Sequence, residues 1–345
     1  MNYNKINNLL GWLSFTVAFL VYYLTIEPTV SFWDCGEYIS TAYKLEVGHP
    51  PGAPLFQLLG RFFSLFAGDV TNVAFMINLM SAACSAFTIL FLFWTITAFA
   101  QKITLSSDEK NELSLAQKIS VFGSGFVGAF AYTFSDSFWF SATEGEVYSM
   151  SSTFTAITFW AILKWERESD DKYAARWIIL IAYLIGLSIG VHLLNLLAIP
   201  ALVFIYYFKK YEPTKFGILK VFLLSVLITG GIQGIIIPQI VNFAKGFELF
   251  FVNTIGLPFN SGTIIYFLLI IALISYGLHY AKKRGKPNMG IALVSFATIL
   301  IGYSTFFILV IRSNANTPID ENNPEDAVSL LAYLNREQYG DWPIL

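Results

Sequence analysis

The chain has little charge. Only 13% of its 345 residues are Asp, Glu, Lys or Arg, whereas 56% are hydrophobic and the mean hydropathy is +0.61. A soluble domain carries about 25% charged residues, so this composition excludes an ordinary soluble fold and indicates a membrane protein. The formal net charge of −2 provides no basic surface, and no nucleic-acid partner is expected.

The motifs of familiar soluble enzymes are also missing. The sequence has no Gly-rich dinucleotide fingerprint, no Walker loop, no nucleophile elbow and no Cys and His spacing typical of a metal site. The two cysteines are Cys35, in a loop segment, and Cys84, in the middle of a long apolar run. A disulfide between them would require the loop to reach deep into the membrane, so the cysteines do not reveal the redox compartment.

Long apolar runs dominate what is present. About 20 helical residues cross the hydrocarbon core, and nine windows of the sequence approach this length. They are 9–26, 73–99, 119–142, 148–164, 177–192, 195–208, 219–240, 263–281 and 289–311. The stretch 177–208 is too long for one crossing, so we expect a break near His192 and Asn195. The sequence thus predicts an all-α polytopic membrane protein with about nine transmembrane helices.

Lys and Arg gather in alternate segments between these windows. Short cytoplasmic loops carry an excess of basic residues, and with a cytoplasmic N-terminus 16 of the 21 Lys and Arg fall on that side. The run 9–26 has no small-residue cleavage site after it, so we expect an anchor and not a signal peptide. Residues 1–312 then form one transmembrane domain. Residues 313–345 form a polar outside tail, which we expect to be the start of a truncated C-terminal region.

The first outside loop, residues 27–70, is too charged to cross and too apolar to stay in water. Its first half, which contains "SFWDCGEYIS", predicts a helix from about Phe32 to Val47 that ends at Gly48. Its second half contains "LFQLLGRFFSLF" and predicts a helix with a narrow polar stripe of Gln57, Arg61 and Ser64. We expect both helices to lie along the membrane interface.

Asp34 and Glu37 are the candidate catalytic residues. They are three residues apart on the first of these helices and therefore share one face. At the outer boundary of the bilayer, where water is scarce, a carboxylate is a strong hydrogen-bond acceptor. Ser31 and Asp34 also fit a capping box, which would make Asp34 a structural residue at the helix start. Glu37 has no such alternative role.

Three further acids are candidates for substrate binding. Asp136 lies near the outer end of the window 119–142, where an ionisable group is either a functional residue or a water-exposed residue of the interface. Glu144 and Glu146 occupy a short turn that must lie at the outer mouth of the bundle. A solvated turn would also accommodate both of them.

Three basic candidates lie on the same predicted side. His192 marks the break in the stretch 177–208, and His49 precedes two prolines. A lone histidine is more often a satisfied core residue than a ligand, so each has a structural alternative. Arg312 follows the last window, where it either anchors the interface or binds an anionic phosphate.

Four blocks of the sequence resemble a known family. They are "FWDCGEYISTAYKLEVGHPPGAPLFQLLGR", "FSDSFWFSATEGEVYSM", "GLSIGVHLLNLLAIPAL" and "IRSNANTPIDENNPEDAVSLLAYLNREQYGDWP". They look like blocks of the bacterial membrane family called domain of unknown function 2723, which is grouped as glycosyltransferase family 117 and is related to protein O-mannosyltransferases. The resemblance spans nearly the whole chain. The D-x-G-E and G-H-P-P-G patterns of the first block are its most distinctive part.

This resemblance implies a GT-C-like bundle with interfacial helices and an acidic catalytic residue in the first outside loop. It implies inverting transfer of a sugar, with mannose as a candidate, from a polyprenyl-phosphate donor to a Ser or Thr hydroxyl of an exported protein. Asp34 is the expected base and Glu37 the second choice. His49, His192 and Arg312 are expected to stabilise the leaving phosphate. No cofactor is required, although a divalent cation remains an option, and the expected location is a bacterial inner membrane with a periplasmic active site.

Two other classes of protein fit the composition. A multispan transporter or lipid flippase would use the outside acids and the break near His192. Transporters place their sites near the midplane, however, where the clear polar residues are Asn78 and Gln233. A noncatalytic membrane scaffold is the third class.

Overall fold

The computed structural model describes residues 2–105 and 113–340, which form fifteen α-helices joined by short turns. In this described part of the chain, the β-type pairing is one isolated bridge between Val47 and Asp320. The predicted class, an all-α polytopic membrane protein, is confirmed. The chain divides into two compact units, of which the first comprises Met1–Tyr43 and Leu58–Asp171 and the second Lys44–Gln57 and Lys172–Leu345.

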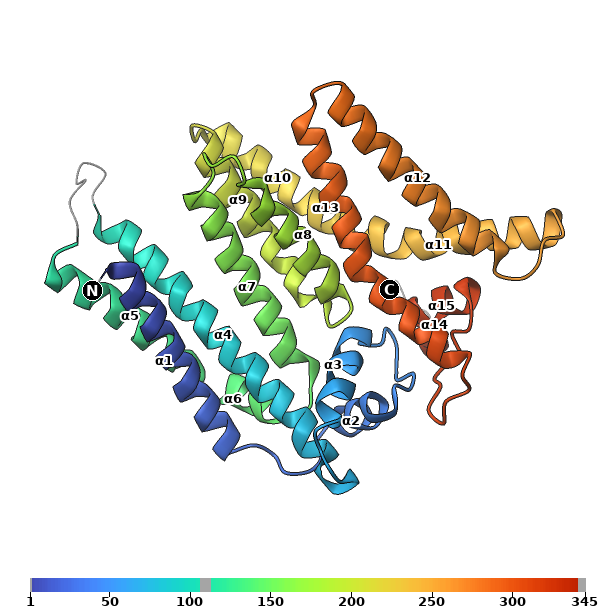
Figure 1. Cartoon of the computed structure of the whole chain (residues 1–345), viewed down its shortest axis with the longest axis horizontal. Helices are drawn as coiled ribbons and strands as arrows, with labels where there is room; N and C mark the ends of the chain where they lie inside the picture. The colour runs from blue at the N-terminus through green and yellow to red at the C-terminus, as the bar shows by residue number, and fades with distance from the viewer. Residues whose placement is uncertain (1, 106–112, 341–345) are drawn as a thin grey trace. The chain divides into compact units, whose positions relative to one another are not determined.

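The first unit is built around α4 (Val73–Thr104). This helix packs against α1 (Tyr3–Leu24), α5 (Leu115–Thr133) and α7 (Val147–Arg167) (Figure 1). Helices within lipid are not driven together by the hydrophobic effect, so their association depends on close packing. Small residues at the helix crossings allow that packing. Gly11 of α1 accordingly lies against the indole of Trp94, and Gly125 of α5 lies against Phe93. The short helix α6 (Asp136–Thr143) connects α5 to α7.

The segment between α1 and α4 carries α2 (Cys35–Lys44) and α3 (Pro54–Ser64). The helix predicted from about Phe32 to Val47 is too long at both ends. Trp33 and Leu45 have positive φ angles of 58° and 51°, and a left-handed residue interrupts a right-handed helix. Ser31 therefore lies too far before the first helical residue to cap it, and the predicted capping box with Ser31 as its first residue is wrong. Asp34 itself directly precedes α2, so a structural role at the helix start stays an alternative for this residue.

The helix α3 turns its predicted polar stripe inward. Gln57 and Ser64 are buried and Arg61 is half-buried, where its Nη1 donates to the carbonyl of Tyr43 at 2.6 Å. Phe62 on the opposite face is exposed, as is Phe66 just beyond the helix. An apolar outer face suits contact with lipid, and the interfacial position of α3 stays a prediction.

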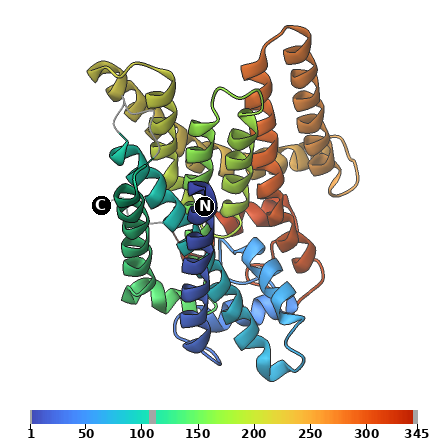
Figure 2. The same ribbon diagram turned by 60° about the vertical axis from the view of Figure 1, so that its left-hand side comes forward.

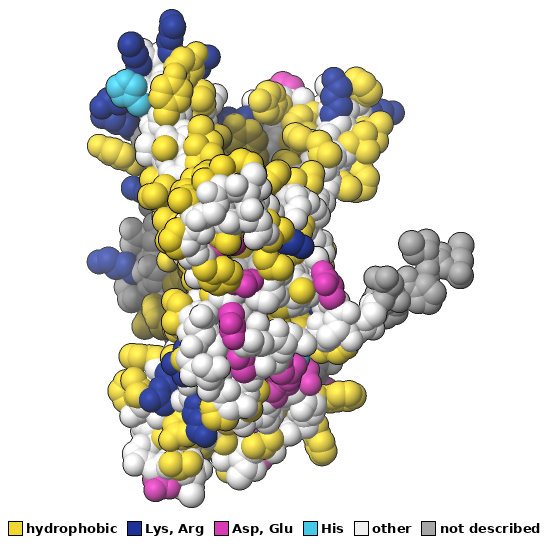
Figure 3. Space-filling model, turned by 90° about the vertical axis from the view of Figure 1, so that its right-hand side faces the viewer, with side chains coloured by type: hydrophobic (Ala, Val, Ile, Leu, Met, Phe, Trp, Pro, Cys, Tyr) yellow, Lys and Arg dark blue, Asp and Glu magenta, His cyan; other side chains and the backbone are white. Residues whose placement is uncertain are grey.

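In the second unit, α12 (Ser261–Lys283) and α13 (Pro287–Tyr303) form an antiparallel pair (Figure 2). The turn between them is basic, and its Lys and Arg side chains stand at the top of Figure 3. α13 also packs against α8 (Ala175–Ile189). There the backbones of Gly186 and Gly302 touch, because neither residue has a Cβ to separate the helices.

The predicted break near His192 and Asn195 is confirmed. α8 ends at Ile189, a 3₁₀ turn spans Leu193–Ala198, and α9 (Ile199–Lys210) follows. The break has a local cause, since the Nδ1 atom of His192 accepts the backbone N–H of Leu194 at 3.1 Å and caps the turn.

The window 219–240 belongs to a longer helical run than predicted. α10 (Lys215–Gly231) continues through a π-helical turn at Ile232–Ile236 into α11 (Ile237–Leu249) and a second π-helical turn at Phe250–Thr254. Forty residues at about 1.5 Å each exceed the hydrocarbon thickness of about 30 Å. The π-helical turn redirects the chain, and α10 and α11 run in different directions in Figure 1.

Six helical runs are long and apolar enough to cross a membrane, judged over the described residues by length and composition. They are Tyr3–Leu24, Val70–Thr104, Leu193–Lys210, Lys215–Thr254, Ser261–Lys283 and Pro287–Ser313. The window 119–142 is divided into α5 and α6, the window 148–164 is the hydroxyl-rich α7, and the window 177–192 is the 15-residue α8. Nine crossings therefore remain a prediction.

The close approach of α8 and α13 predicts the effect of one methyl group. A Cβ at Gly302 would meet backbone atoms of Gly186, whereas among the described residues nothing lies within 4 Å of a Cβ at Gly290 on the same helix. We expect Gly302→Ala to lower the free energy of unfolding by about 1–3 kcal/mol. We expect Gly290→Ala to be neutral or stabilising by up to about 1 kcal/mol. Thermal unfolding in detergent measures both, and equal effects would contradict the proposed backbone contact.

Candidate functional site

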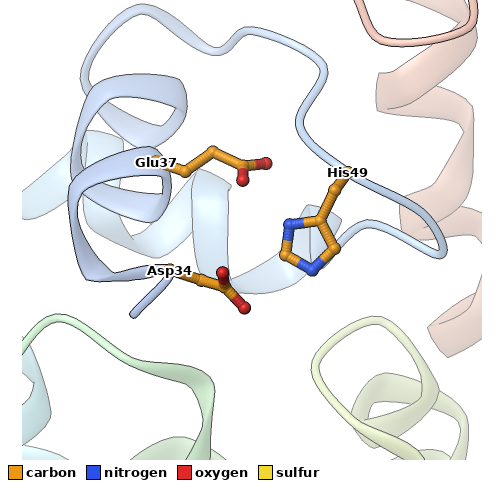
Figure 4. Close-up of side chains that lie close together, drawn as sticks. All are labelled: Asp34, Glu37 and His49. Atoms are coloured by element: carbon orange, nitrogen blue, oxygen red, sulfur yellow. The ribbon is translucent and has the colours of Figure 1, made fainter. Parts of the chain in front are cut away.

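The two candidate catalytic acids stand at the beginning of α2. Asp34 directly precedes the helix and Glu37 lies in its first turn. Their side chains project from the same side of α2 (Figure 4), with carboxylate oxygens within 4.8 Å of each other. Asp34 is exposed and Glu37 is half-buried. Two carboxylates at this distance can share a proton or bind one hard divalent cation.

The loop that leads into α2 is fixed from α4. The Nδ2 atom of Asn78 donates to the carbonyls of Glu27 at 2.6 Å and of Thr29 at 2.9 Å. The backbone N–H of Glu27 donates to the carbonyl of Thr143 at 3.0 Å. Asn78 is completely buried, so these bonds are shielded from water. Asn78 is a polar residue within the predicted span 73–99, and the structure shows that its side chain serves to bind carbonyls of the loop.

A second set of contacts fixes the loop just before Asp34. The side chain of Ser31 hydrogen-bonds to the carboxyl group of Glu144. The sulfur of Cys35 accepts from the backbone N–H groups of Ser31 and Gly145. Asp34 therefore lies between two residues that are both tied to the turn before α7.

Glu144 and Glu146 are buried and not solvated. Glu144 is 4% exposed and Glu146 is 5% exposed, so their interpretation as members of a solvated turn is wrong. Burial raises the pKa of Glu144, opposed by its hydrogen bond with Ser31. Its Oε2 atom has no hydrogen-bond partner among the described residues. Glu146 precedes α7 and accepts the backbone N–H of Val147 at 3.2 Å.

Tyr38 belongs to this group of acids, and sequence analysis missed it. It is four residues after Asp34 on α2, so the two share a face. Burial, followed by the negative charges of Glu146, Asp34 and Glu37, raises the pKa of the Tyr38 phenol far above its usual range. The phenol therefore stays neutral and can donate a hydrogen bond among the carboxylates. The i, i+4 spacing from Asp34 was the available sequence signal.

Asp136 and His192 are candidates on other elements of the chain. Asp136 is exposed in the first turn of α6. His192, in the second unit, caps the turn after α8, and burial lowers the pKa of its imidazole. His192 is therefore a neutral ring at neutral pH with Nδ1 already used as an acceptor.

The last two candidates belong to the second unit. His49 is half-buried on the segment 44–57 (Figure 4). The guanidinium of Arg312 binds the beginning of the same segment, since Nε donates to the carbonyl of Leu45 at 2.5 Å and Nη2 to that of Lys44 at 3.2 Å. Two of the donors that sequence analysis assigned to a phosphate or to the interface are therefore used on backbone carbonyls.

The fold and these side chains define a class of protein, an all-α polytopic membrane protein with carboxylates gathered on the loops between its helices. Residues 34–215 match the family model described as the N-terminal domain of protein O-mannosyl-transferase TMEM260. This match covers more than half of the chain, and the chain belongs to that family. The predicted relation to protein O-mannosyltransferases is confirmed, while the name domain of unknown function 2723 stays a prediction.

Curated relatives carry the same name. Protein O-mannosyl-transferase tmem260 of Dictyostelium discoideum is 29% identical over 189 residues, which are 53% of this chain and 21% of the relative. Protein O-mannosyl-transferase TMEM260 of Mus musculus is 27% identical over 170 residues, which are 49% of this chain and 21% of the relative. The matched stretch thus spans about a fifth of each relative. No solved structure matches the chain.

The buried carboxyl group of Glu144 predicts a pH dependence of stability. Because its pKa is raised above the ordinary 4.5, the folded protein keeps a proton that the unfolded chain has lost, and stability falls as pH rises above that value. We expect Glu144→Gln, which cannot ionise, to flatten the fall in melting temperature between about pH 5 and pH 8. The exposed acid Asp171 provides the control Asp171→Asn, which should keep the parental profile. A parental profile in Glu144→Gln would contradict the assignment.

Proposed function

We propose that this protein is a membrane glycosyltransferase that transfers mannose from a polyprenyl-phosphate donor to Ser or Thr hydroxyl groups of an exported protein. The observation that carries the proposal is the pair Asp34 and Glu37 on one face of α2, inside a stretch that belongs to the O-mannosyl-transferase family. The relatives are named for O-mannosyl transfer to protein. The lipid-linked donor and the inverting course come from the resemblance described above.

Asp34 acts as the general base in this proposal. Its carboxylate takes the proton of the acceptor hydroxyl while the hydroxyl oxygen forms a bond to the anomeric carbon of the sugar. The bond from that carbon to the phosphate oxygen breaks, and the phosphate leaves with the electron pair. Direct displacement inverts the configuration at the carbon. A positioned base of this kind contributes about 10²–10⁴-fold to the rate.

Glu37 and Tyr38 tune this base. The carboxylate of Glu37 lies within 4.8 Å of that of Asp34, and the neutral phenol of Tyr38 supplies a donor that keeps one carboxylate oriented. The Oε2 atom of Glu144, which has no hydrogen-bond partner among residues 2–105 and 113–340, and the carboxylate of the neighbouring Glu146 are acceptors for sugar hydroxyls. Asp136, which is exposed, contacts the acceptor protein. A divalent cation between Asp34 and Glu37 is compatible with this scheme but is not required.

The leaving phosphate gains negative charge and needs donors. We assign this role to His49, His192 and the remaining donors of Arg312. With the N-terminus in the cytoplasm, the loop 27–70 lies on the periplasmic side of a bacterial inner membrane. The distribution of Lys and Arg along the sequence supports this orientation.

A groove in the second unit supports a donor with a long apolar chain. A cavity of about 420 Å³ lies between α11, α12, α13 and α15 (Ala327–Leu334). Its lining is mostly aliphatic and aromatic. The polar residues are Asn260, Thr263 and Asp326, where α12 and α15 begin, together with Ser275 and Ser304. α12 and α13 are long and apolar enough to cross the membrane, so the groove offers a lipid chain a site continuous with the bilayer.

Removing either acid tests the mechanism. We expect Asp34→Asn to lower the rate of sugar transfer by about 10²–10⁴-fold, because the variant lacks the base, and Glu37→Gln to have a smaller effect. Transfer from a polyprenyl-phosphate sugar and release of polyprenyl phosphate are measured with purified protein. Glu212→Gln, an exposed acid of the second unit, is the control. Parental rates in both variants would overturn the mechanism, and transport of an intact donor would indicate a transporter instead.

Filling the groove tests the lipid donor. Ala297 lines the groove on α13, whereas Ala292 on the same helix is exposed and does not line it. We expect Ala297→Phe to raise KM about tenfold for a long-chain donor, because the added ring occupies space that the chain needs, a loss of roughly 1.4 kcal/mol. A short-chain donor should be used normally. Ala292→Phe should leave both KM values unchanged, and the same result for Ala297→Phe would contradict the role of the groove.

A further inference from the structure

The segment that carries His49 is held by residues from the end of the second unit. Tyr333 of α15 is completely buried, and its hydroxyl donates to the carbonyl of Gly48 at 2.6 Å. The guanidinium of Arg336 donates to the carbonyl of Pro50 through Nε at 3.0 Å and Nη2 at 2.7 Å. The two residues that flank His49, Gly48 and Pro50, therefore both accept hydrogen bonds on their carbonyls from side chains at the end of α15.

The backbone on either side of His49 is also fixed. The N–H of Val47 donates to the carbonyl of Ile319 at 3.0 Å, and the N–H of Glu321 donates to the carbonyl of Val47 at 3.0 Å. The N–H of Gly52 donates to the carbonyl of His49 at 2.9 Å. With Tyr333 and Arg336 in place, the path of the chain through residues 47–52 has little freedom, and so has the direction in which the imidazole leaves it.

The backbone conformation of Arg336 indicates that its side chain does more than end α15. Arg336 has a φ of 58°, a left-handed conformation, directly after the residue that closes α15. Glycine is the usual residue at such a position because it has no Cβ to clash. An arginine that adopts this conformation and places two N–H groups on one carbonyl is explained by the contact it makes.

We infer that Tyr333 and Arg336 are positioning residues that aim the His49 imidazole by fixing the carbonyls of Gly48 and Pro50. The inference rests on the proposed function, in which His49 meets the leaving phosphate. Neither side chain touches substrate in this role. Both act through the backbone of the His49 segment, and the chemical group they serve is an imidazole that donates to a phosphate oxygen.

The chain has three histidines, His49, His192 and His279, which allows a direct test without turnover. Diethyl pyrocarbonate modifies each imidazole at a rate that depends on its surroundings, and mass spectrometry of the purified full chain measures the three rates separately. In Tyr333→Phe, which removes one hydrogen bond, and in Arg336→Gly, which removes two to the same carbonyl, we expect the rate at His49 to change by about fivefold or more. The rates at His192 and His279 should stay at the parental values. Tyr276→Phe, which removes an exposed hydroxyl of α12, should change none of them.

Two further measurements separate positioning from a merely structural role. Arg336→Gly relieves the left-handed backbone, which offsets the loss of its hydrogen bonds to the Pro50 carbonyl, so we expect its melting temperature to stay close to that of the parent although its His49 rate changes. In the transfer assay we expect kcat to fall about fivefold in both variants with KM for the acceptor unchanged.

An unchanged rate at His49 in both variants overturns the inference, as does a changed rate with parental kcat. A lower melting temperature in Arg336→Gly with equal changes at all three histidines would assign a structural role and overturn it as well. If the parent transfers no sugar from any polyprenyl-phosphate donor, the proposed function fails, while the modification rates still decide whether Tyr333 and Arg336 fix His49.

Discussion

Side-chain donors on backbone carbonyls hold the segment on which the proposed catalytic residues lie. The segment between α1 and α3 has much irregular backbone, and a buried carbonyl without a donor costs free energy. In the first unit the donors are Asn78 and Arg61, and in the second unit Arg312, Tyr333 and Arg336. Each donor comes from a helix or from the residues that end one. These hydrogen bonds attach the irregular parts of the segment to packed helices and thereby limit their motion.

This arrangement holds several acidic side chains together at the proposed catalytic site of an otherwise apolar protein. Glu144 and Glu146 are buried beside Ser31, Cys35 and Tyr38 in the first unit, while Asp34 is exposed. Burial raises the pKa of Glu144 and that of the Tyr38 phenol. The phenol is therefore a neutral hydrogen-bond donor beside the exposed carboxylate of Asp34, which the proposed mechanism uses as the base.

The sequence predicted those features that depend on local spacing. The shared face of Asp34 and Glu37 follows from the helical period, and the break at His192 follows from the limit on the length of one crossing. The ends of α2 could not be predicted, because Trp33 and Leu45 adopt left-handed conformations without being glycine. The side chains that donate to the loop carbonyls could not be predicted either. Arg336 and its acceptor are 286 residues apart, and no local pattern marks a bond of that sequence separation.

The stretch that matches the family model and the residues that fix its loop are not the same. The match to the family model covers residues 34–215, which include Asp34, Glu37 and His49. The donors to the carbonyls of residues 44, 45, 48 and 50 lie at Arg312, Tyr333 and Arg336, outside the match. Residues 44–57 accordingly belong to the same compact unit as residues 172–345. The chemistry proposed for the matched stretch therefore depends on a later part of the chain, because without those donors the carbonyls on both sides of His49 would lose the partners that set its direction.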